Sequence, residues 1–277
     1  MKAALLQLNS GDDPEANLPV TIHMLDRAVA EGVGFVLTPE VTNCVSASRT
    51  RQTEVLRPEA DDPTLAALKA RAKSHGIWLL IGSLALKTDD PDGRFVNRSF
   101  LITPEGKVAA RYDKIHMFDV AVSETETYRE SAGYRPGDRA VMVDTPFARL
   151  GMTICYDLRF PGLYRQLAEA GAQVITVPSA FSPVTGAAHW ETLLRARAIE
   201  AGAYILAPAQ TGLHCASRGR SRETYGHSMV IDPWGRVLAE GGTKCGIISV
   251  DLDLAEVATS RQSIPAMTQM MKVDGPE

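Results

Sequence analysis

The stretch Leu150-Gly151-Met152-Thr153-Ile154-Cys155-Tyr156-Asp157-Leu158-Arg159-Phe160-Pro161 contains the unit on which the fold prediction depends. Its first five residues form an apolar run, which predicts a buried strand ending at Ile154. Pro161 suits the first position of a helix, and the following pattern predicts a helix to about Ala170. Cys155 then lies on the turn between them. A strand followed by a helix is the repeating unit of α/β proteins.

The same order of elements occurs earlier in the chain. Ala3–Leu8 predicts a strand, and Pro14, behind two aspartates that can cap a helix, opens an amphipathic helix. Val33–Leu37 is an apolar run of strand length. A second helix begins at Asp62-Pro63, and a buried strand over Ile77–Ile81 follows it. These repeats predict parallel strands with helices between them.

Other segments predict antiparallel hairpins. Phe95–Ile102 and Val108–Tyr112 flank the turn signal Thr103-Pro104-Glu105-Gly106. The elements predicted farther along are a strand over 174–177, a helix over about 188–201, a strand over 204–207, a hairpin around 232–235 and a strand over 246–250. Hairpins combined with βα units indicate mixed sheets. Two such sheets with helices outside would form a four-layer α-β-β-α sandwich, an arrangement that periodicity alone does not establish.

Length and composition indicate a globular protein. The 277 residues are 45% hydrophobic and 22% charged, with a net charge of −4. We predict a single domain over residues 1–270 and a frayed tail over 271–277. The charge gives no indication of a global basic surface for nucleic acid or an anionic membrane, and no run approaches the roughly 20 apolar residues of a membrane span. Four widely spaced cysteines give no disulfide framework, so we expect a cytoplasmic protein.

Three residues are candidates for chemistry because of their positions. Backbone N–H groups at a strand-to-helix turn can lower a thiol pKa from about 8.5 and can bind an oxyanion, which makes Cys155 a candidate nucleophile. Its alternative role is that of a buried structural cysteine. Glu40 follows a buried strand and is either a catalytic carboxylate or a solvated loop charge. Lys114 follows the first predicted hairpin and is either a catalytic cation or a solvated loop charge.

Together these segments resemble the nitrilase, or carbon–nitrogen hydrolase, superfamily, which has a Glu-Lys-Cys triad. The matching segments are Leu37-Thr38-Pro39-Glu40, Tyr112-Asp113-Lys114-Ile115-His116, Ile154-Cys155-Tyr156-Asp157-Leu158-Arg159-Phe160-Pro161, Pro178-Ser179-Ala180-Phe181, Gly186-Ala187-Ala188-His189-Trp190-Glu191, Arg195-Ala196-Arg197-Ala198-Ile199-Glu200, Tyr225-Gly226-His227-Ser228-Met229 and Asp232-Pro233-Trp234-Gly235. Any one segment is a weak signal, whereas their ordered agreement over nearly the whole chain is a strong one.

The resemblance implies the sandwich fold and a role for each member of the triad. Cys155 would attack an amide carbon, Glu40 would act as the general base, and Lys114 would hold the oxyanion together with the backbone N–H of Tyr156. Water would then hydrolyse the thioester. The resemblance also implies a second glutamate near the lysine, which we match to Glu130.

Glu124 and Glu126 lie in the same polar loop and are alternatives for that second glutamate. The resemblance implies no metal and no organic cofactor. His116, His189 and His227 lack metal-ligand spacing, and we expect structural hydrogen bonds from them. A Cys-His dyad with His116 or His227 is a further alternative.

Within the superfamily, Ala207-Pro208-Ala209-Gln210-Thr211-Gly212 and Thr224-Tyr225-Gly226-His227-Ser228-Met229 most resemble the deaminated-glutathione amidase branch. This implies a small carboxylate-bearing amide as substrate, with deaminated glutathione the first candidate, and a homodimer or larger homo-oligomer. The candidate substrate-binding residues are Phe181, Thr185, Arg218, Arg220 and Arg222. If the loop with the three arginines folds over the site, it could clamp two separated carboxylates. The alternative is a solvated basic loop.

Three other functions stay open at this point. One is an omega-amidase that acts on 2-oxoglutaramate or 2-oxosuccinamate, and another is a nitrile hydrolase with the same triad. The third, of a different class, is a catalytically inactive binding protein on the same fold.

Overall fold

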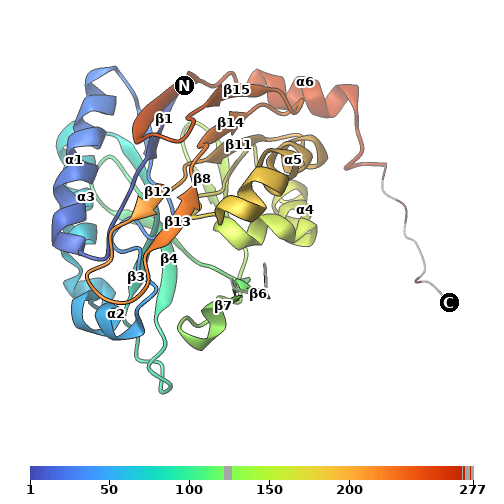
Figure 1. Cartoon of the computed structure of the whole chain (residues 1–277). Coiled ribbons are helices and arrows are strands. Elements are labelled where there is room, and N and C mark those ends of the chain that lie inside the picture. The colour runs from blue at the N-terminus through green and yellow to red at the C-terminus, as the bar shows by residue number, and fades with distance from the viewer. Residues whose placement is uncertain (122–126, 270, 272–274, 276–277) are drawn as a thin grey trace.

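Two six-stranded mixed sheets form the centre of the computed structural model, which describes residues 1–121, 127–269, 271 and 275 (Figure 1). The first sheet contains, in order, β16 Gly246–Asp251, β1 Lys2–Gln7, β2 Phe35–Leu37, β3 Trp78–Leu86, β4 Val96–Ile102 and β5 Val108–Asp113. The second contains β15 Val237–Glu240, β14 Met229–Ile231, β11 Tyr204–Ala207, β10 Val174–Thr176, β9 Arg149–Met152 and β8 Val141–Asp144. In each sheet three neighbouring strands are parallel and the others pair antiparallel.

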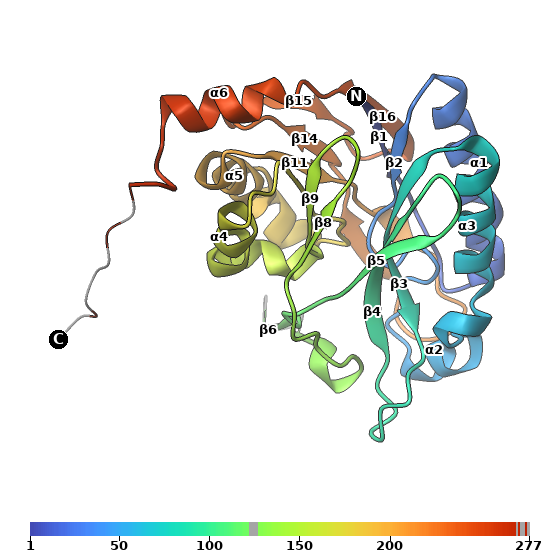
Figure 2. The ribbon, with the colours of Figure 1, turned by 180° about the vertical axis from the view of Figure 1, so that it is seen from behind.

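Helices cover the outer face of each sheet. The helices α1 Pro14–Ala30 and α3 Pro63–His75 lie beside the first sheet, and α4 Pro161–Glu169 and α5 Pro183–Ala201 lie beside the second (Figures 1 and 2). Alternate residues of β1 serve different layers, since Leu5 joins a core cluster with residues of both sheets and Leu6 packs in the cluster shared with α1 and α3. The predicted four-layer α-β-β-α sandwich is therefore confirmed.

Most predicted elements are present, and several boundaries were wrong. The strand β2 begins at Phe35 rather than Val33, and β3 continues to Leu86 instead of ending at Ile81. The strand β9 ends at Met152 rather than Ile154, because Asp157 turns the chain by accepting a hydrogen bond from the N–H of Ile154. The helix α5 begins at Pro183, about five residues earlier than predicted, because Pro183 suits a first helical position. The sequence did not predict the short elements α2 Arg49–Val55, β6 Asp119–Ala121, β7 Thr127–Arg129, β8 Val141–Asp144, β12 Thr211–His214, β13 Arg222–Tyr225 and α6 Ala255–Ser263, nor the 3₁₀ turns η1 Glu59–Asp61, η2 Glu130–Ala132 and η3 Cys155–Arg159.

Two predictions, the frayed tail and the single domain, are not tested by the residues that the structure describes. The predicted frayed tail lies outside them apart from residues 271 and 275, and the single domain over 1–270 stays a prediction. In the part of the chain that the structure describes, no helix has the length and apolar character needed to cross a bilayer.

Candidate active site

Cys155 is the first residue of η3, just after β9. Its φ of 47° lies in the left-handed region, which residues with a side chain rarely adopt. Its N–H donates to the carbonyl of Pro178 over 3.0 Å, which attaches the turn to the segment after β10. Such backbone strain costs about 1–3 kcal/mol and is concentrated at functional sites. The predicted strand-to-helix turn thus holds the thiol in a fixed, strained position.

Asp157 joins this turn to the segment that carries Lys114. Its carboxylate is fully buried and accepts the N–H of Ile154 over 2.9 Å. The hydroxyl of Tyr112 donates to it over 2.7 Å, and the N–H of His116 over 3.0 Å. The Nδ1 atom of His116 lies 2.7 Å from the same carboxylate. Because Lys114 lies between Tyr112 and His116, one buried carboxylate sets the spacing of two predicted catalytic segments.

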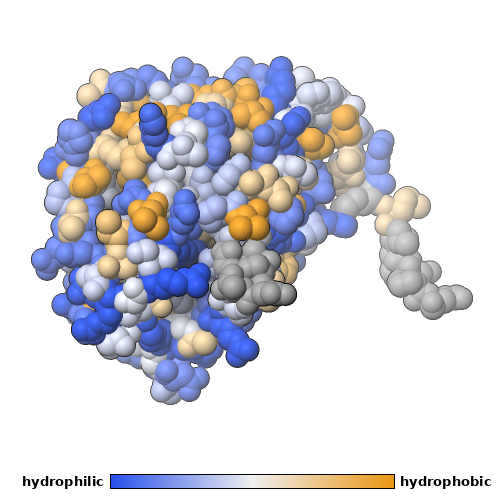
Figure 3. Space-filling model, viewed as in Figure 1, coloured by the Kyte–Doolittle hydropathy of each residue, from blue (hydrophilic) through white to orange (hydrophobic). Residues whose placement is uncertain are grey.

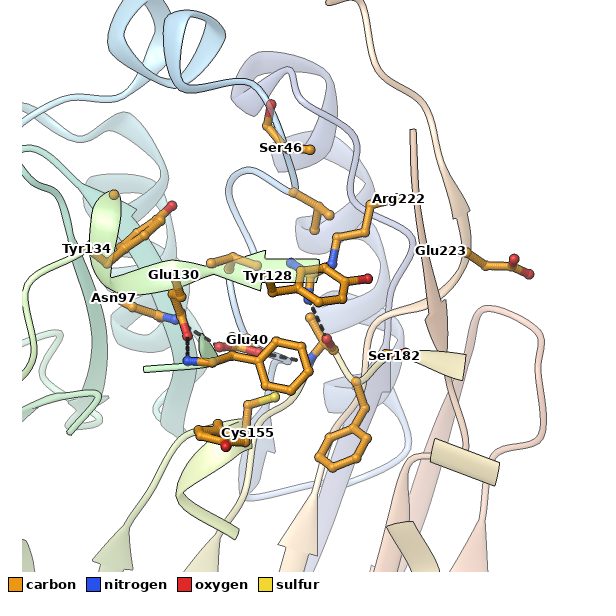
Figure 4. A pocket seen from close by; sticks show the side chains of 18 of the residues that line it. Glu40, Ser46, Asn97, Tyr128, Glu130, Tyr134, Cys155, Ser182, Arg222 and Glu223 are labelled. Atoms are coloured by element: carbon orange, nitrogen blue, oxygen red, sulfur yellow. Dashed lines mark hydrogen bonds between the residues drawn. The ribbon is translucent and has the colours of Figure 1, made fainter. Parts of the chain in front are cut away.

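Lys114 lies between the carboxylates of Glu40 and Glu130, both of which are labelled in Figure 4. Its Nζ is 2.9 Å from Oε1 of Glu40 and 2.9 Å from each carboxylate oxygen of Glu130. Glu130 is fixed in turn by the N–H of Phe118, which donates to its Oε2 over 2.7 Å. The alternatives Glu124 and Glu126 lie outside the described residues.

Two residues that the sequence analysis missed orient the carboxylate of Glu40. Asn97 on β4 donates from Nδ2 to Oε1 of Glu40 over 2.8 Å, and the N–H of Ala180 donates to Oε2 over 2.8 Å. The backbone carbonyl of Asn97 also accepts the N–H of Lys114 over 3.0 Å. An asparagine within a strand is a weak sequence signal, and Ala180 acts through its backbone, which leaves no signal in its side chain.

A glycine allows the Glu40 loop to pack against β3. A Cβ at Gly82 would lie 2.0 Å from the carbonyl oxygen of Thr38 and 2.6 Å from that of Pro39. The N–H of Gly82 donates to Oγ1 of Thr38 over 3.0 Å, and Oγ of Ser83 accepts the N–H of Val41 over 2.7 Å. The absent side chain therefore sets the position of the loop that carries Glu40.

The charges of these groups follow from burial and from their neighbours. Burial would raise the pKa of Glu40, but the Lys114 ammonium, the Arg222 guanidinium and a hydrogen bond from the Cys155 thiol hold it below 4.5. Burial would lower the pKa of Lys114, but Glu130 and Glu40 raise it well above 10.5. Burial and the charge of Glu40 raise the pKa of the Cys155 thiol above 9.0.

A strand-to-helix turn can lower a thiol pKa, but in this site the pKa of Cys155 is raised. Burial and the neighbouring carboxylate both disfavour the thiolate, and the charge of Lys114 offsets only part of their effect. The resting site holds a neutral thiol beside an ionised carboxylate, which suits proton transfer at the moment of attack.

The predicted catalytic residues share one cavity of about 880 Å³, which Glu40, Lys114, Glu130, Cys155 and Tyr156 help to line. Four of the five predicted substrate-binding residues also line it, namely Phe181, Thr185, Arg220 and Arg222. The structure does not bring Arg218 to this cavity, since its Nη1 forms a 2.5 Å ion pair with Glu54 of α2.

The histidines have protein partners. His116 contacts Asp157, as described above, and Nδ1 of His189 lies 3.3 Å from the guanidinium of Arg159. Nδ1 of His227 lies 2.6 Å from Glu240, which agrees with the structural role expected for these side chains. Within residues 1–121 and 127–269, no three acidic, histidine or cysteine side chains are grouped to hold a metal ion.

Comparison with known proteins identifies the class of enzyme. The model of the carbon-nitrogen hydrolase family matches residues 2–262, so the chain belongs to that family and is an amidase. It is 39% identical over 265 residues to the deaminated glutathione amidase of Yersinia enterocolitica, covering 95% of this chain and 91% of that protein.

Two solved structures have the same fold. The NitFhit protein of C. elegans superposes with a TM-score of 0.89 at 36% identity, over 97% of this chain and 64% of that one. A mutant amidase from Nesterenkonia sp. AN1 shows Michael addition of acrylamide at its active site cysteine. It matches with a TM-score of 0.77 at 25% identity, over 96% of this chain and 98% of that one.

Proposed function

We propose that this amidase acts through a thioester on Cys155. The observation that carries the proposal is the meeting of Glu40, Lys114 and Cys155, from both sheets, in one cavity. Glu40 is ionised while the thiol is protonated, so the carboxylate can accept the thiol proton. The reactive cysteine of the Nesterenkonia amidase supports a nucleophilic role for Cys155.

The acylation half of the reaction would use the triad as follows. Glu40 takes the thiol proton while Sγ of Cys155 bonds to the amide carbon, and the carbonyl π electrons move to oxygen. The Lys114 ammonium and the N–H of Tyr156 bind this oxyanion, and one such donor is typically worth about 10²–10³ in rate. The carbonyl re-forms, the C–N bond breaks, and the amine leaves with the proton that Glu40 held.

Deacylation would use the same carboxylate. Glu40 takes a proton from water, the resulting hydroxide adds to the thioester carbon, and the C–S bond breaks. The proton on Glu40 returns to Sγ of Cys155, and the acid is released. Asn97 and Ala180 hold the carboxylate in one orientation for both steps. Glu130 keeps Lys114 charged and in place.

For the substrate, we propose a small amide with carboxylates, and deaminated glutathione is the first candidate. The Yersinia relative carries that name, and a cavity of about 880 Å³ has room for a dipeptide leaving group. Arg220 and Arg222 bring positive charge to the cavity, and Phe181 contributes an apolar wall. Oγ1 of Thr185 is buried and has no hydrogen-bond partner in the described residues, so it can bind a substrate polar group.

Each alternative function accounts for fewer features of the site than the proposed amidase does. The ω-amides 2-oxoglutaramate and 2-oxosuccinamate release ammonia. The part of the cavity that could hold a dipeptide leaving group would then have no role. A nitrile hydrolase would use the same triad, and no described feature favours a nitrile over an amide. An inactive binding protein is disfavoured because the three reactive groups lie together in one hydrogen-bonded site.

The test compares kcat/KM for deaminated glutathione, 2-oxoglutaramate and a matching nitrile at fixed ionic strength, with intact mass spectrometry of the quenched enzyme. We expect deaminated glutathione to be preferred and an acyl adduct on Cys155 to be detected. A preference for 2-oxoglutaramate would replace the substrate and keep the mechanism. Turnover without any adduct on Cys155, under conditions where deacylation is slowed, would count against the mechanism.

The predicted homo-oligomer and cytoplasmic location also stay proposals. Apolar surface gathers near the upper edge of the molecule, over β15 and its neighbours (Figures 1 and 3). The exposed large apolar side chains in and near this region are Ile199, Trp234, Val237, Leu238 and Ile264. Contact between copies would cover such a surface, and sedimentation measurements would show a dimer or larger assembly. The free thiols of Cys155, Cys44, Cys215 and Cys245 suit a reducing compartment.

A further inference from the structure

Arg222 reaches into the cavity from the side opposite Cys155 (Figure 4). Its Nη2 donates to the carbonyl oxygen of Ala180 over 2.7 Å. The N–H of the same Ala180 donates to Oε2 of Glu40 over 2.8 Å. Ala180 thus contacts both the guanidinium and the proposed general base, and the charge of Arg222 helps to lower the pKa of Glu40.

The guanidinium of Arg222 is incompletely paired. Its Nε is buried without a hydrogen-bond partner in the described residues, and no carboxylate of those residues forms an ion pair with it. Its other contact is with the face of the Tyr128 ring, 6.0 Å from the centroid. A partly buried cation with free donors favours an anion beside it, because burial without a partner is costly.

The neighbouring arginines are placed differently. Arg218 is more than half exposed and already paired with Glu54. Arg220 lines the cavity but is exposed to solvent. Of the three arginines in this loop, Arg222 combines partial burial, free donors and contact with the residue that orients Glu40.

We propose that Arg222 binds the acyl carboxylate of the substrate and thereby couples the charge of the substrate to proton transfer at Glu40. This inference rests on the proposed amidase function. An acyl carboxylate at Arg222 would neutralise one of the two cations that act on Glu40. Glu40 would then bind a proton more strongly, and so be a better base, when a carboxylated substrate is in place. A neutral amide would bind without this gain.

The other groups that face Glu40 cannot play this part. The Lys114 ammonium is shared with Glu130, and removing its charge would break the triad itself. The thiol of Cys155 is the proton donor, and Tyr134 is a partly buried phenol whose pKa burial raises. The acyl carboxylate also stays on the enzyme in the thioester, so its effect on Glu40 would continue through deacylation.

The inference predicts a particular pH dependence. Activity requires ionised Glu40, so the acid limb of kcat/KM reports the free enzyme and the acid limb of kcat reports the complex. With a carboxylated substrate, the acid limb of kcat should lie at higher pH than that of kcat/KM. With the methyl ester of the same substrate, the two limbs should coincide, because the charge of Arg222 is unchanged on binding.

The experiment uses the ω-amide of a dicarboxylic acid and its methyl ester, with the variants Arg222→Gln, Arg222→Lys and Arg165→Gln. Glutamine keeps an N–H donor but has no charge, and lysine keeps the charge. Arg165 pairs with Glu169 on the surface of α4 and is the control for loss of one arginine. Unfolding midpoints check that each variant is folded.

We expect Arg222→Gln to lower kcat/KM for the carboxylate about tenfold or more and that for the ester less than about threefold. With the carboxylated substrate, the pH difference between the acid limbs of kcat and kcat/KM should vanish in Arg222→Gln. It should persist in Arg222→Lys and Arg165→Gln. Equal losses on both substrates, or a gap that survives in Arg222→Gln, would overturn the coupling. If the wild-type enzyme formed no thioester with either substrate, the amidase mechanism itself would be at fault, so the two failures are distinguishable.

Discussion

Lys114 and Glu40 form a 2.9 Å ion pair between side chains that are only 3% and 5% exposed. Burying two charges costs desolvation, and their attraction repays it only when each charge is well partnered. Here Asn97 and Ala180 complete the partners of Glu40, and Glu130 completes those of Lys114. The groups proposed for catalysis therefore also contribute to stability, and their variants must be measured for both.

Replacing the proposed nucleophile should remove activity without unfolding the protein. Cys155→Ala deletes Sγ and leaves a small gap, so we expect an unfolding midpoint near that of the wild type and no thioester. Cys155→Ser should keep little turnover, because a hydroxyl is a weaker nucleophile. Cys215→Ala, at an exposed cysteine, is the control. Residual activity of Cys155→Ala above about a few percent of wild type would contradict the assignment.

Removing the lysine charge should cost both rate and stability. In Lys114→Met, Glu40 and Glu130 lose the cation that lies between them, which we expect to destabilise the fold by about 3–5 kcal/mol and to lower kcat. Adding Glu40→Gln should recover part of the stability but none of the activity. Urea unfolding and steady-state kinetics of the single and double variants measure both effects. A single Lys114→Met variant as stable as the wild type would show that the pair is not needed for folding.

Stability should depend on pH through the same pair. The pKa of Glu40 is depressed, so its contribution is fully present above pH 4.5 and is lost as pH falls through the lower folded-state value. The pKa of Lys114 is raised, so its contribution is fully present below pH 10.5 and is lost as pH rises through the higher folded-state value. The unfolding free energy of the wild type minus that of Glu40→Gln should be flat above pH 4.5 and fall below it. If this difference in unfolding free energy increased as the pH fell, the pKa of Glu40 would be raised by folding, and the prediction would be wrong.

The close approach at Gly82 gives a test of the Glu40 loop. In Gly82→Ala the new Cβ would meet the backbone of Thr38, which cannot yield without moving the loop. Because small displacements of catalytic groups are costly, we expect kcat/KM to fall about 10²-fold or more. Gly34→Ala is the matched control, since nothing lies within 4 Å of its Cβ position. Similar activity in the two variants would show that the packing at Gly82 does not position Glu40.

The sequence predicted the larger elements because long apolar runs and helix caps are local signals. It missed β12 and β13 because their pairing depends on distant contacts, such as the hydrogen bond from Tyr225 to Phe181. The triad was recognisable from ordered motifs, whereas Asn97 was not, because its role depends on which strand lies beside Glu40. The sequence also could not separate Arg218 from Arg222, since only the fold turns one toward Glu54 and the other into the cavity.

The site lies across the seam between two sheets, with Glu40 and Lys114 following strands of the first and Cys155 following a strand of the second. Neither half of the chain can hold the thiol against its base by itself. Turnover during refolding therefore requires that the two sheets have already docked. The time at which turnover returns should therefore report when the two sheets dock, which the signals of single helices and strands do not report.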